Sequence, residues 1–184
     1  MPACQSSACE LKLATLRRGV PGDATSIAAL SIQVFLDTYA TEGVRPDLAR
    51  EALTHYSPEQ FARRLSDENL SFVLAEVGEG LLGFAEVNTR PSPPPIQGIA
   101  IDGPELVRLY IQPTAQRTGL GRRLLRESEL MCERSGSGAL WLTAWSGNAR
   151  ALAFYRALGY VDVGASTYTF QGTSYENRVL VKRR

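Results

Sequence analysis

The sequence contains few of the residues that build metal sites or covalent-catalysis sites. It has one histidine, His55, and three cysteines, Cys4, Cys9 and Cys132. No C-x-x-C or H-x-E-type spacing occurs, which argues against a structural or catalytic metal. A Cys–His nucleophile pair would have to join Cys132 to His55. Cys132, however, falls on the apolar face of a predicted helix and is expected to fill the core.

The sequence also has no large excess of either charge and no long apolar run. The chain has 20 basic and 19 acidic residues, so its composition gives no electrostatic grip on nucleic acid or an anionic membrane. No segment resembles a signal peptide or is long enough to span a bilayer, so we expect a cytoplasmic protein. We expect a loose tail over residues 1–10 and a single domain over 11–184, a length that allows a sizeable core.

Hydrophobic periodicity and turn residues predict alternating strands and helices. Strands are expected at residues 11–16, 70–77, 81–87, 105–111, 139–144, 161–170 and 175–181. Helices are expected from Asp23, as the cap, to about Tyr39, from Pro46 to about Leu53, from Pro58 to Leu65, from the glycine loop described next to about Ser135, and over 148–158. This order predicts an α/β fold with one layer of sheet and helices packed on it.

The most informative segment is the loop Gln116-Arg117-Thr118-Gly119-Leu120-Gly121. It lies between the apolar strand at 105–111 and an amphipathic helix. Backbone N–H groups at the start of a helix favour anions, and glycine lets the backbone approach a phosphate closely. The loop therefore predicts a diphosphate site. An ordinary strand–turn–helix junction would give the same short pattern.

A second group of residues lies on the helix at 148–158. Asn148 and Tyr155 are two helical turns apart, so both side chains point to one side. Each also has an ordinary structural interpretation. Asn148 is a good N-cap, and Tyr155 can be a core aromatic residue with its hydroxyl satisfied.

Together the two segments resemble the GNAT acetyltransferases. The first is Gln116-x-x-Gly119-x-Gly121, and the second runs from Trp141-Leu-Thr-Ala-Trp through Asn148 and Phe154-Tyr155 to Gly159-Tyr160. The segments Val34-Phe-Leu-Asp-Thr-Tyr39 and Glu105-Leu-Val-Arg-Leu-Tyr-Ile111 further resemble the PaiA-like polyamine acetyltransferases. The resemblance implies a GNAT fold, with a central mixed seven-stranded sheet flanked by helices and a V-shaped splay between strands four and five. It also implies an N-acetyltransferase that uses acetyl-CoA.

The resemblance implies where acetyl-CoA would bind. Pantetheine would lie along main-chain groups of Leu109 and Ile111, and an N–H near Leu109 or Tyr110 would stabilise the oxyanion. Asn148 would bond the pantetheine amide or a nearby water. Main-chain N–H groups would hold the diphosphate, with added bonds from the Gln116 and Arg122 side chains. These N–H groups belong to Arg117, Thr118, Gly119, Leu120, Gly121 and Arg122.

The resemblance also implies two proton-transfer roles and an acceptor site. Tyr155 matches the general acid that protonates the departing thiolate. Glu105 is at the position of a general base, and Glu86 is the second candidate; a solvated Glu105 and a packing Tyr155 are the structural alternatives. The acceptor would contact Phe35, Tyr39, Tyr56 and the proline-rich loop at 91–103. Nearby carboxylates, diluted by arginines, favour a polyamine only weakly, and a peptide amine remains open. Many relatives pair, so a homodimer is possible.

Two other functions fit parts of the pattern. A non-catalytic module that binds acyl-CoA would need the loop but not Tyr155 as well. A phosphate-loop nucleotide hydrolase is disfavoured, because no Lys-Ser/Thr pair follows the glycines. An enzyme is therefore the preferred prediction.

Overall fold

The computed structural model describes residues 14–170 and 173–183. The chain forms two compact units. Unit 1 consists of Met1–Glu86 and Arg108–Ser128, and unit 2 consists of Val87–Val107 and Glu129–Arg184. The expected tail and the first three residues of the strand predicted at 11–16 lie outside the described residues. The single domain predicted from residue 11 stays a prediction.

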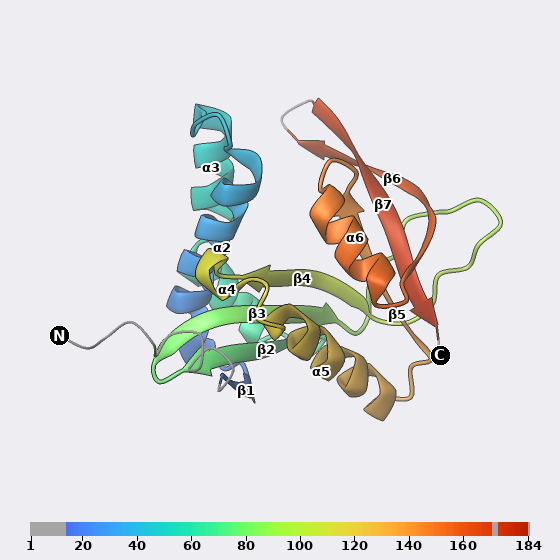
Figure 1. The fold of residues 1–184 in the computed structure, drawn as a ribbon, viewed down its shortest axis with the longest axis horizontal. Helices are drawn as coiled ribbons and strands as arrows, with labels where there is room; N and C mark the ends of the chain where they lie inside the picture. The colour runs from blue at the N-terminus through green and yellow to red at the C-terminus, as the bar shows by residue number, and fades with distance from the viewer. Residues whose placement is uncertain (1–13, 171–172, 184) are drawn as a thin grey trace. The chain divides into compact units, whose positions relative to one another are not determined.

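Seven strands of the described residues form one mixed sheet in the order β1-β2-β3-β4-β5-β7-β6 (Figure 1). They are β1 Thr15–Arg18, β2 Leu70–Val77, β3 Gly80–Asn88, β4 Glu105–Ile111, β5 Ala139–Trp145, β6 Val161–Phe170 and β7 Thr173–Arg183. β1 pairs with β2, and β7 pairs with both β5 and β6, in antiparallel fashion. β4 and β5 are parallel, with Glu105 opposite Trp141 at the beginning of β4. The predicted α/β class and mixed sheet are confirmed.

The helices follow the predicted order. They are α2 Ala24–Tyr39, α3 Pro46–His55, α4 Pro58–Leu65, α5 Leu120–Arg134 and α6 Ala149–Ala157, with short 3₁₀ turns η1 Pro21–Asp23 and η2 Pro113–Ala115. Ser57 caps α4 by accepting a hydrogen bond from the Gln60 N–H. This N-cap and the proline at the first helical position explain why α4 begins where it does.

Two local predictions differ in part from the structure. Asp23 is the N-cap residue of α2, as predicted, but its side chain makes no capping hydrogen bond. Its carboxylate instead accepts a hydrogen bond from the Val20 N–H at 2.8 Å and pairs with Arg17, because the chain first makes the turn η1. The last strand is also longer than the predicted 175–181, since β7 runs from Thr173 to Arg183.

Unit 1 is built around aromatic side chains. Phe61 of α4 contacts Phe72 of β2 and Phe84 of β3, with ring centroids 6.4 and 6.2 Å away. All three side chains are buried. Burial of such large apolar groups is the main stabilising contribution to a core of this kind. It fixes α4 against the sheet strands of unit 1.

Unit 2 has its own core around Trp141 of β5. Ile101, Val179 and Val181 are buried with it, and Ile96 and Ile99 pack against this cluster. The indole N–H of Trp141 also donates to the Gly103 carbonyl at 3.0 Å. The proline-rich loop thus covers part of this core with its isoleucines, a role that the prediction of acceptor binding did not include.

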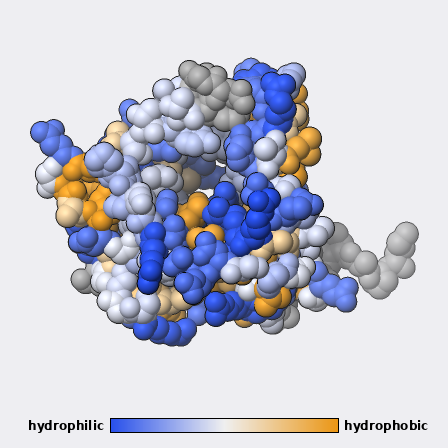
Figure 2. All heavy atoms as spheres, turned by 180° about the vertical axis from the view of Figure 1, so that it is seen from behind, coloured by the Kyte–Doolittle hydropathy of each residue, from blue (hydrophilic) through white to orange (hydrophobic). Residues whose placement is uncertain are grey.

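Exposed apolar side chains are scattered over the described surface. They include Val20, Val44, Leu53, Val161 and Tyr168. Figure 2 shows one face on which hydrophobic patches are separated by hydrophilic residues. Scattered apolar residues of this kind are normal and do not by themselves mark a docking surface. Among the described residues, none of the helices has the length and apolar character that a membrane span requires.

Candidate active site

The glycine loop of unit 1 has a backbone shape that few sequences adopt. After η2, Arg117 has φ 62° and Gly119 has φ 89°, both in the left-handed region. Arg117 is the only non-glycine residue with positive φ in the described part of the chain. Left-handed residues make successive N–H groups point into one concavity, which binds anions. The loop leads directly into α5, which begins at Leu120.

The loop is held from within by two side chains. The Thr118 hydroxyl donates to the Ala115 carbonyl at 2.7 Å, and the Gln116 amide donates to the Ile111 carbonyl at 3.2 Å. The Gln116 side chain was predicted to bond the diphosphate, but its amide nitrogen fixes the end of β4 to the loop. Arg122 is exposed on the first turn of α5.

The backbone N–H groups of residues 117–122 donate to no backbone carbonyl within the described ranges. The next N–H, that of Arg123, donates to the Gly119 carbonyl at 3.1 Å. The first N–H groups of any helix lack intrahelical partners, so they are available to an anion. A Cβ built on Gly119 would meet nothing within 4 Å. The loop therefore combines available donors with open space, as a diphosphate requires.

The part of β4 that belongs to unit 1 carries the residues predicted to bind pantetheine and the oxyanion. Leu109, Tyr110 and Ile111 are all partly buried. A Cβ on Gly83 of β3 would come within 2.8 Å of the Tyr110 carbonyl and the Ile111 side chain, so glycine is required there for the strands to approach. The tight packing fixes the position of this segment.

The three predicted acceptor-binding residues lie together in unit 1. The Phe35 ring is 5.1 Å from Tyr39 and 5.3 Å from Tyr56, measured between centroids. The Tyr56 and Tyr110 hydroxyls are 3.4 Å apart. Burial raises the pKa of Tyr56, and Tyr110 adds to the shift, so the Tyr56 hydroxyl stays protonated at neutral pH. Phe35, Tyr39 and Tyr56 thus form an aromatic wall that contacts β4 through Tyr110.

Sequence reasoning missed an ionic cluster beside this wall. Glu86 of β3 is fully buried, and its two oxygens bind Arg64 of α4 and Arg108 of β4. The Arg108 Nη1 atom is 2.5 Å from Glu86 Oε2. Because both oxygens are occupied by guanidinium groups, Glu86 is poorly suited to remove a proton. The available signal was a charged residue with apolar neighbours on both sides in each of two strands.

In unit 2, Asn148 and Tyr155 lie on α6 as predicted. Asn148 caps the helix, because its side-chain oxygen accepts from the Ala151 N–H at 3.0 Å. This bond leaves the amide nitrogen as the donor for a ligand. Tyr155 is buried, and its ring lies 5.2 Å from Phe154 and 5.6 Å from Tyr160.

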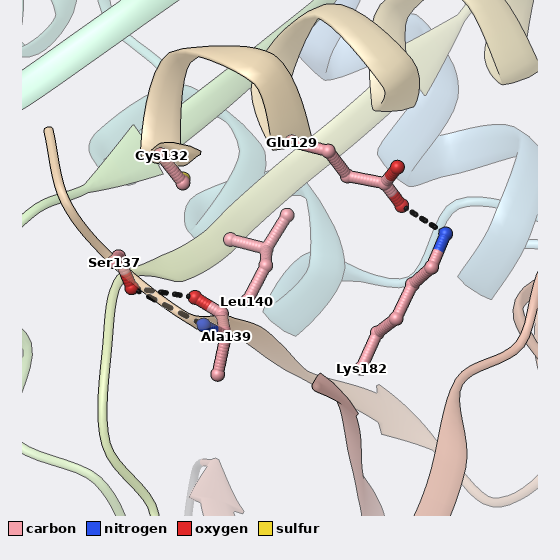
Figure 3. A pocket seen from close by; sticks show the side chains of 6 residues that line it. All are labelled: Glu129, Cys132, Ser137, Ala139, Leu140 and Lys182. Atoms are coloured by element: carbon pink, nitrogen blue, oxygen red, sulfur yellow. Dashed lines mark hydrogen bonds and ion pairs between the residues drawn. The ribbon is translucent and has the colours of Figure 1, made fainter. Parts of the chain in front are cut away.

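A buried hydrogen-bond network holds Tyr160. Its hydroxyl donates to Glu129 at 3.3 Å. The same carboxylate oxygen accepts from Lys182 at 2.9 Å, and Figure 3 shows this Glu129–Lys182 bond. Burial raises the pKa of Tyr160, and Glu129 raises it further. Glu129 and Lys182 line a cavity of about 10 Å³, enough for roughly one water molecule. This cavity is too small for a substrate. We therefore interpret the hydrogen bonds among Tyr160, Glu129 and Lys182 as structural support for the contact between the Tyr155 and Tyr160 rings.

Glu105, the predicted base, lies in unit 2 at the beginning of β4. It is partly buried and follows the buried Pro104. The Trp141 N–H donates to the Pro104 carbonyl at 3.1 Å, which fixes the backbone at this position. Among the described residues, three or more His, Cys, Asp or Glu side chains nowhere gather as a metal site would require.

Solved structures share this fold. The PaiA N-acetyltransferase from Thermoplasma acidophilum, solved in complex with coenzyme A, has a TM-score of 0.71 to this chain at 20% sequence identity. The similarity covers 93% of this chain and 99% of that chain. At this identity the likeness defines the fold, which is that of the GNAT N-acetyltransferases.

The sequence comparisons then give the family. A model described as an acetyltransferase (GNAT) domain matches residues 35–176. The chain therefore belongs to the GNAT acetyltransferases, a family of enzymes that use acetyl-CoA.

Two curated relatives are similar to part of the chain. The N-alpha-acetyltransferase RimI of Mycobacterium tuberculosis is 31% identical over 109 residues, which is 59% of this chain and 63% of the relative. The ribosomal protein bS18-alanine N-acetyltransferase of Escherichia coli is 31% identical over 105 residues, covering 57% and 64% respectively. The similarity thus spans a little under two thirds of the length of each relative.

Proposed function

We propose that this protein transfers an acetyl group from acetyl-CoA to a primary amine by direct attack of the amine on the thioester. The acceptor is a small molecule or a peptide amine. The observation that supports this most strongly is the loop at 116–122. Its N–H groups, left-handed Arg117 and open Gly119 suit a diphosphate, and the family uses a diphosphate-containing co-substrate.

Different residues of the chain bind different parts of acetyl-CoA. N–H groups of residues 117–122 hold the diphosphate, and the exposed Arg122 adds a cation. Main-chain groups of Leu109 and Ile111 bond the pantetheine arm. An N–H at Leu109 or Tyr110 stabilises the oxyanion, and the Asn148 amide nitrogen donates to pantetheine. Such preorganised donors lower the barrier because they need no rearrangement during the reaction.

Two side chains transfer protons in the reaction. An alkylamine is mostly protonated at neutral pH, so Glu105 accepts a proton from it through water before attack. Attack forms the N–C bond, and the C–S bond breaks as Tyr155 donates its proton to the departing thiolate. The nitrogen then loses its extra proton to solvent, and Tyr155 regains a proton from solvent. We also propose a cytoplasmic location and a homodimer, as expected from the sequence.

The experiment is a cofactor-dependent assay. Purified protein is mixed with acetyl-CoA and a panel of amines, and free thiol is measured with a thiol reagent. Amine-dependent thiol release supports the proposal. Binding of acetyl-CoA without thiol release from any amine would instead identify a non-catalytic acyl-CoA module.

The role of Glu105 has a separate test. Glu105→Gln should remove the limb of the rate profile that rises with pH, because the variant cannot accept the proton. The measurement is kcat/KM against pH for both proteins. A profile unchanged in shape would exclude Glu105 as the base.

A further inference from the structure

The ionic cluster in unit 1 contains more positive than negative charge. Glu86 is 0% exposed and lies between Arg64 and Arg108, so one carboxylate faces two guanidinium groups. Buried charges are costly unless they are paired and hydrogen-bonded. The cluster therefore has one cation in excess, which a bound anion would neutralise.

Arg108 has donors left for such an anion. A guanidinium has five N–H groups, and Arg108 uses only Nη1 for its hydrogen bond to Glu86. Within residues 14–170 and 173–183, Nη2 and Nε of Arg108 donate to no protein acceptor. The side chain is 18% exposed, so a small compound can reach it. The guanidinium carbon also lies over the Tyr56 ring, 5.6 Å from its centroid, which fixes its position.

Arg108 lies on the acceptor side of β4. Alternate residues of a strand face one way, so Arg108 and Tyr110 share a face and Leu109 and Ile111 face the other way. The Tyr110 hydroxyl contacts Tyr56, one of the three residues of the aromatic wall. The excess positive charge is therefore next to the residues proposed to contact the amine.

Two of the nearby carboxylates already have side-chain partners. Asp47 is paired with Arg45 at 2.9 Å, and Glu51 with His55 at 2.9 Å. A polyamine would bring several further positive charges to a region that already has an excess. This arrangement disfavours the polycation that the sequence weakly favoured.

We propose that the acceptor is a small amine with a carboxylate beside its amino group, an amino-acid type of compound whose carboxylate binds the available N–H groups of Arg108. This rests on the proposed function. A guanidinium matches a carboxylate with two parallel hydrogen bonds. Because Arg108 is largely covered, a small molecule reaches it more readily than a peptide chain does.

The test compares matched acceptors in the thiol-release assay. Each common amino acid is compared with its own amide, and several with the corresponding amine that lacks the carboxylate; spermidine and an alanine-terminated peptide are included. The best amino acid should exceed its amide in kcat/KM by about tenfold or more, as expected for a hydrogen bond to a charged group. Equal or higher kcat/KM for the amide, spermidine or the peptide would overturn the inference and leave the proposed function intact. Absence of thiol release with every acceptor would contradict the proposed function itself.

Variants then assign the preference to Arg108. Arg108→Met should lower kcat/KM about tenfold for the amino acid and much less for its amide. Arg45→Met, which removes an exposed pair in the same unit, should leave the preference unchanged. If Arg108→Met does not fold, as judged by circular dichroism, Arg108→Lys retains a charge but loses the two-pronged geometry and should show a reduced preference. An unchanged preference in the folded Arg108 variant would overturn the assignment.

Discussion

Each compact unit buries a glutamate, and the two glutamates are neutralised differently. In unit 1, Glu86 is bound by Arg64 and Arg108. In unit 2, Glu129 is 5% exposed and accepts from Lys182 and the uncharged Tyr160 hydroxyl. The first cluster has an excess positive charge and the second is balanced. We infer that the first is arranged to receive an anionic ligand and that the second supports Tyr160 beneath the proposed general acid.

The largest expected effect concerns the stability of the first cluster. Glu86→Gln leaves the partly buried Arg64 and Arg108 without their shared, fully buried counter-charge, and breaking a buried ion pair in this way costs about 3–5 kcal/mol. Glu129→Gln should cost less, about 1–3 kcal/mol, because it removes the counter-charge of one cation, Lys182, whereas Glu86→Gln removes that of two. Urea unfolding of both variants measures the difference. Equal losses of unfolding free energy in Glu86→Gln and Glu129→Gln would contradict the difference proposed between the two clusters.

The next effect separates the chemical step from acceptor binding. Tyr155→Phe should lower kcat by about 100-fold, because the thiolate loses its proton donor. The KM for acetyl-CoA should change little. Tyr56→Phe in unit 1 should mainly raise the KM of the acceptor, since it loses the hydroxyl contact with Tyr110. Steady-state kinetics of both variants provide the check, and wild-type kcat in Tyr155→Phe would make Tyr155 a packing residue.

The smallest effect concerns an exposed network in unit 2. Hydrogen bonds from Arg178 lower the pKa of Asp162 against the opposing effect of burial, and Arg156 contributes to the lowering. A lowered pKa in the folded state stabilises the protein above the unfolded pKa of about 3.9, and this stabilisation is lost as pH falls through the folded pKa.

Asp162→Asn should therefore cost about 1 kcal/mol at pH 7, and this difference should shrink below about pH 4. Urea unfolding at pH 7 and pH 3 measures it. Arg178→Met should lose most of this pH-dependent component, because it removes the stronger of the two arginine partners of Asp162. A difference that stays constant with pH would show that the ion pair does not contribute.

Most of the helices and strands could be predicted because their signals are local. Pro58 after Ser57, for example, marks the start of α4 within a few residues. Asp23 is the N-cap residue of α2 as predicted, but its carboxylate binds Arg17 and the Val20 N–H instead of a helix N–H. Neither interaction is visible in a capping pattern.

The candidate site could be predicted only where a motif is continuous. The loop at 116–122 and the pair Asn148 and Tyr155 are found from short patterns. Glu86 lies 22 residues from each of its arginine partners, and Glu129 lies 53 residues from Lys182. Such pairs are formed by tertiary packing, so one sequence without its fold does not reveal them.

The most direct test of the account is the affinity of the loop at 116–122 for acetyl-CoA, measured by calorimetric titration. Gly119 and Gly136 provide a matched pair, because both have positive φ and a Cβ on either would meet nothing within 4 Å. Substituting Asp should strain the backbone similarly at both positions. Gly119→Asp also places a negative charge beside the diphosphate and should weaken binding by about 100-fold or more. Gly136→Asp should leave the Kd within about threefold of the wild-type value. Equal Kd values for the two variants would contradict the proposed site.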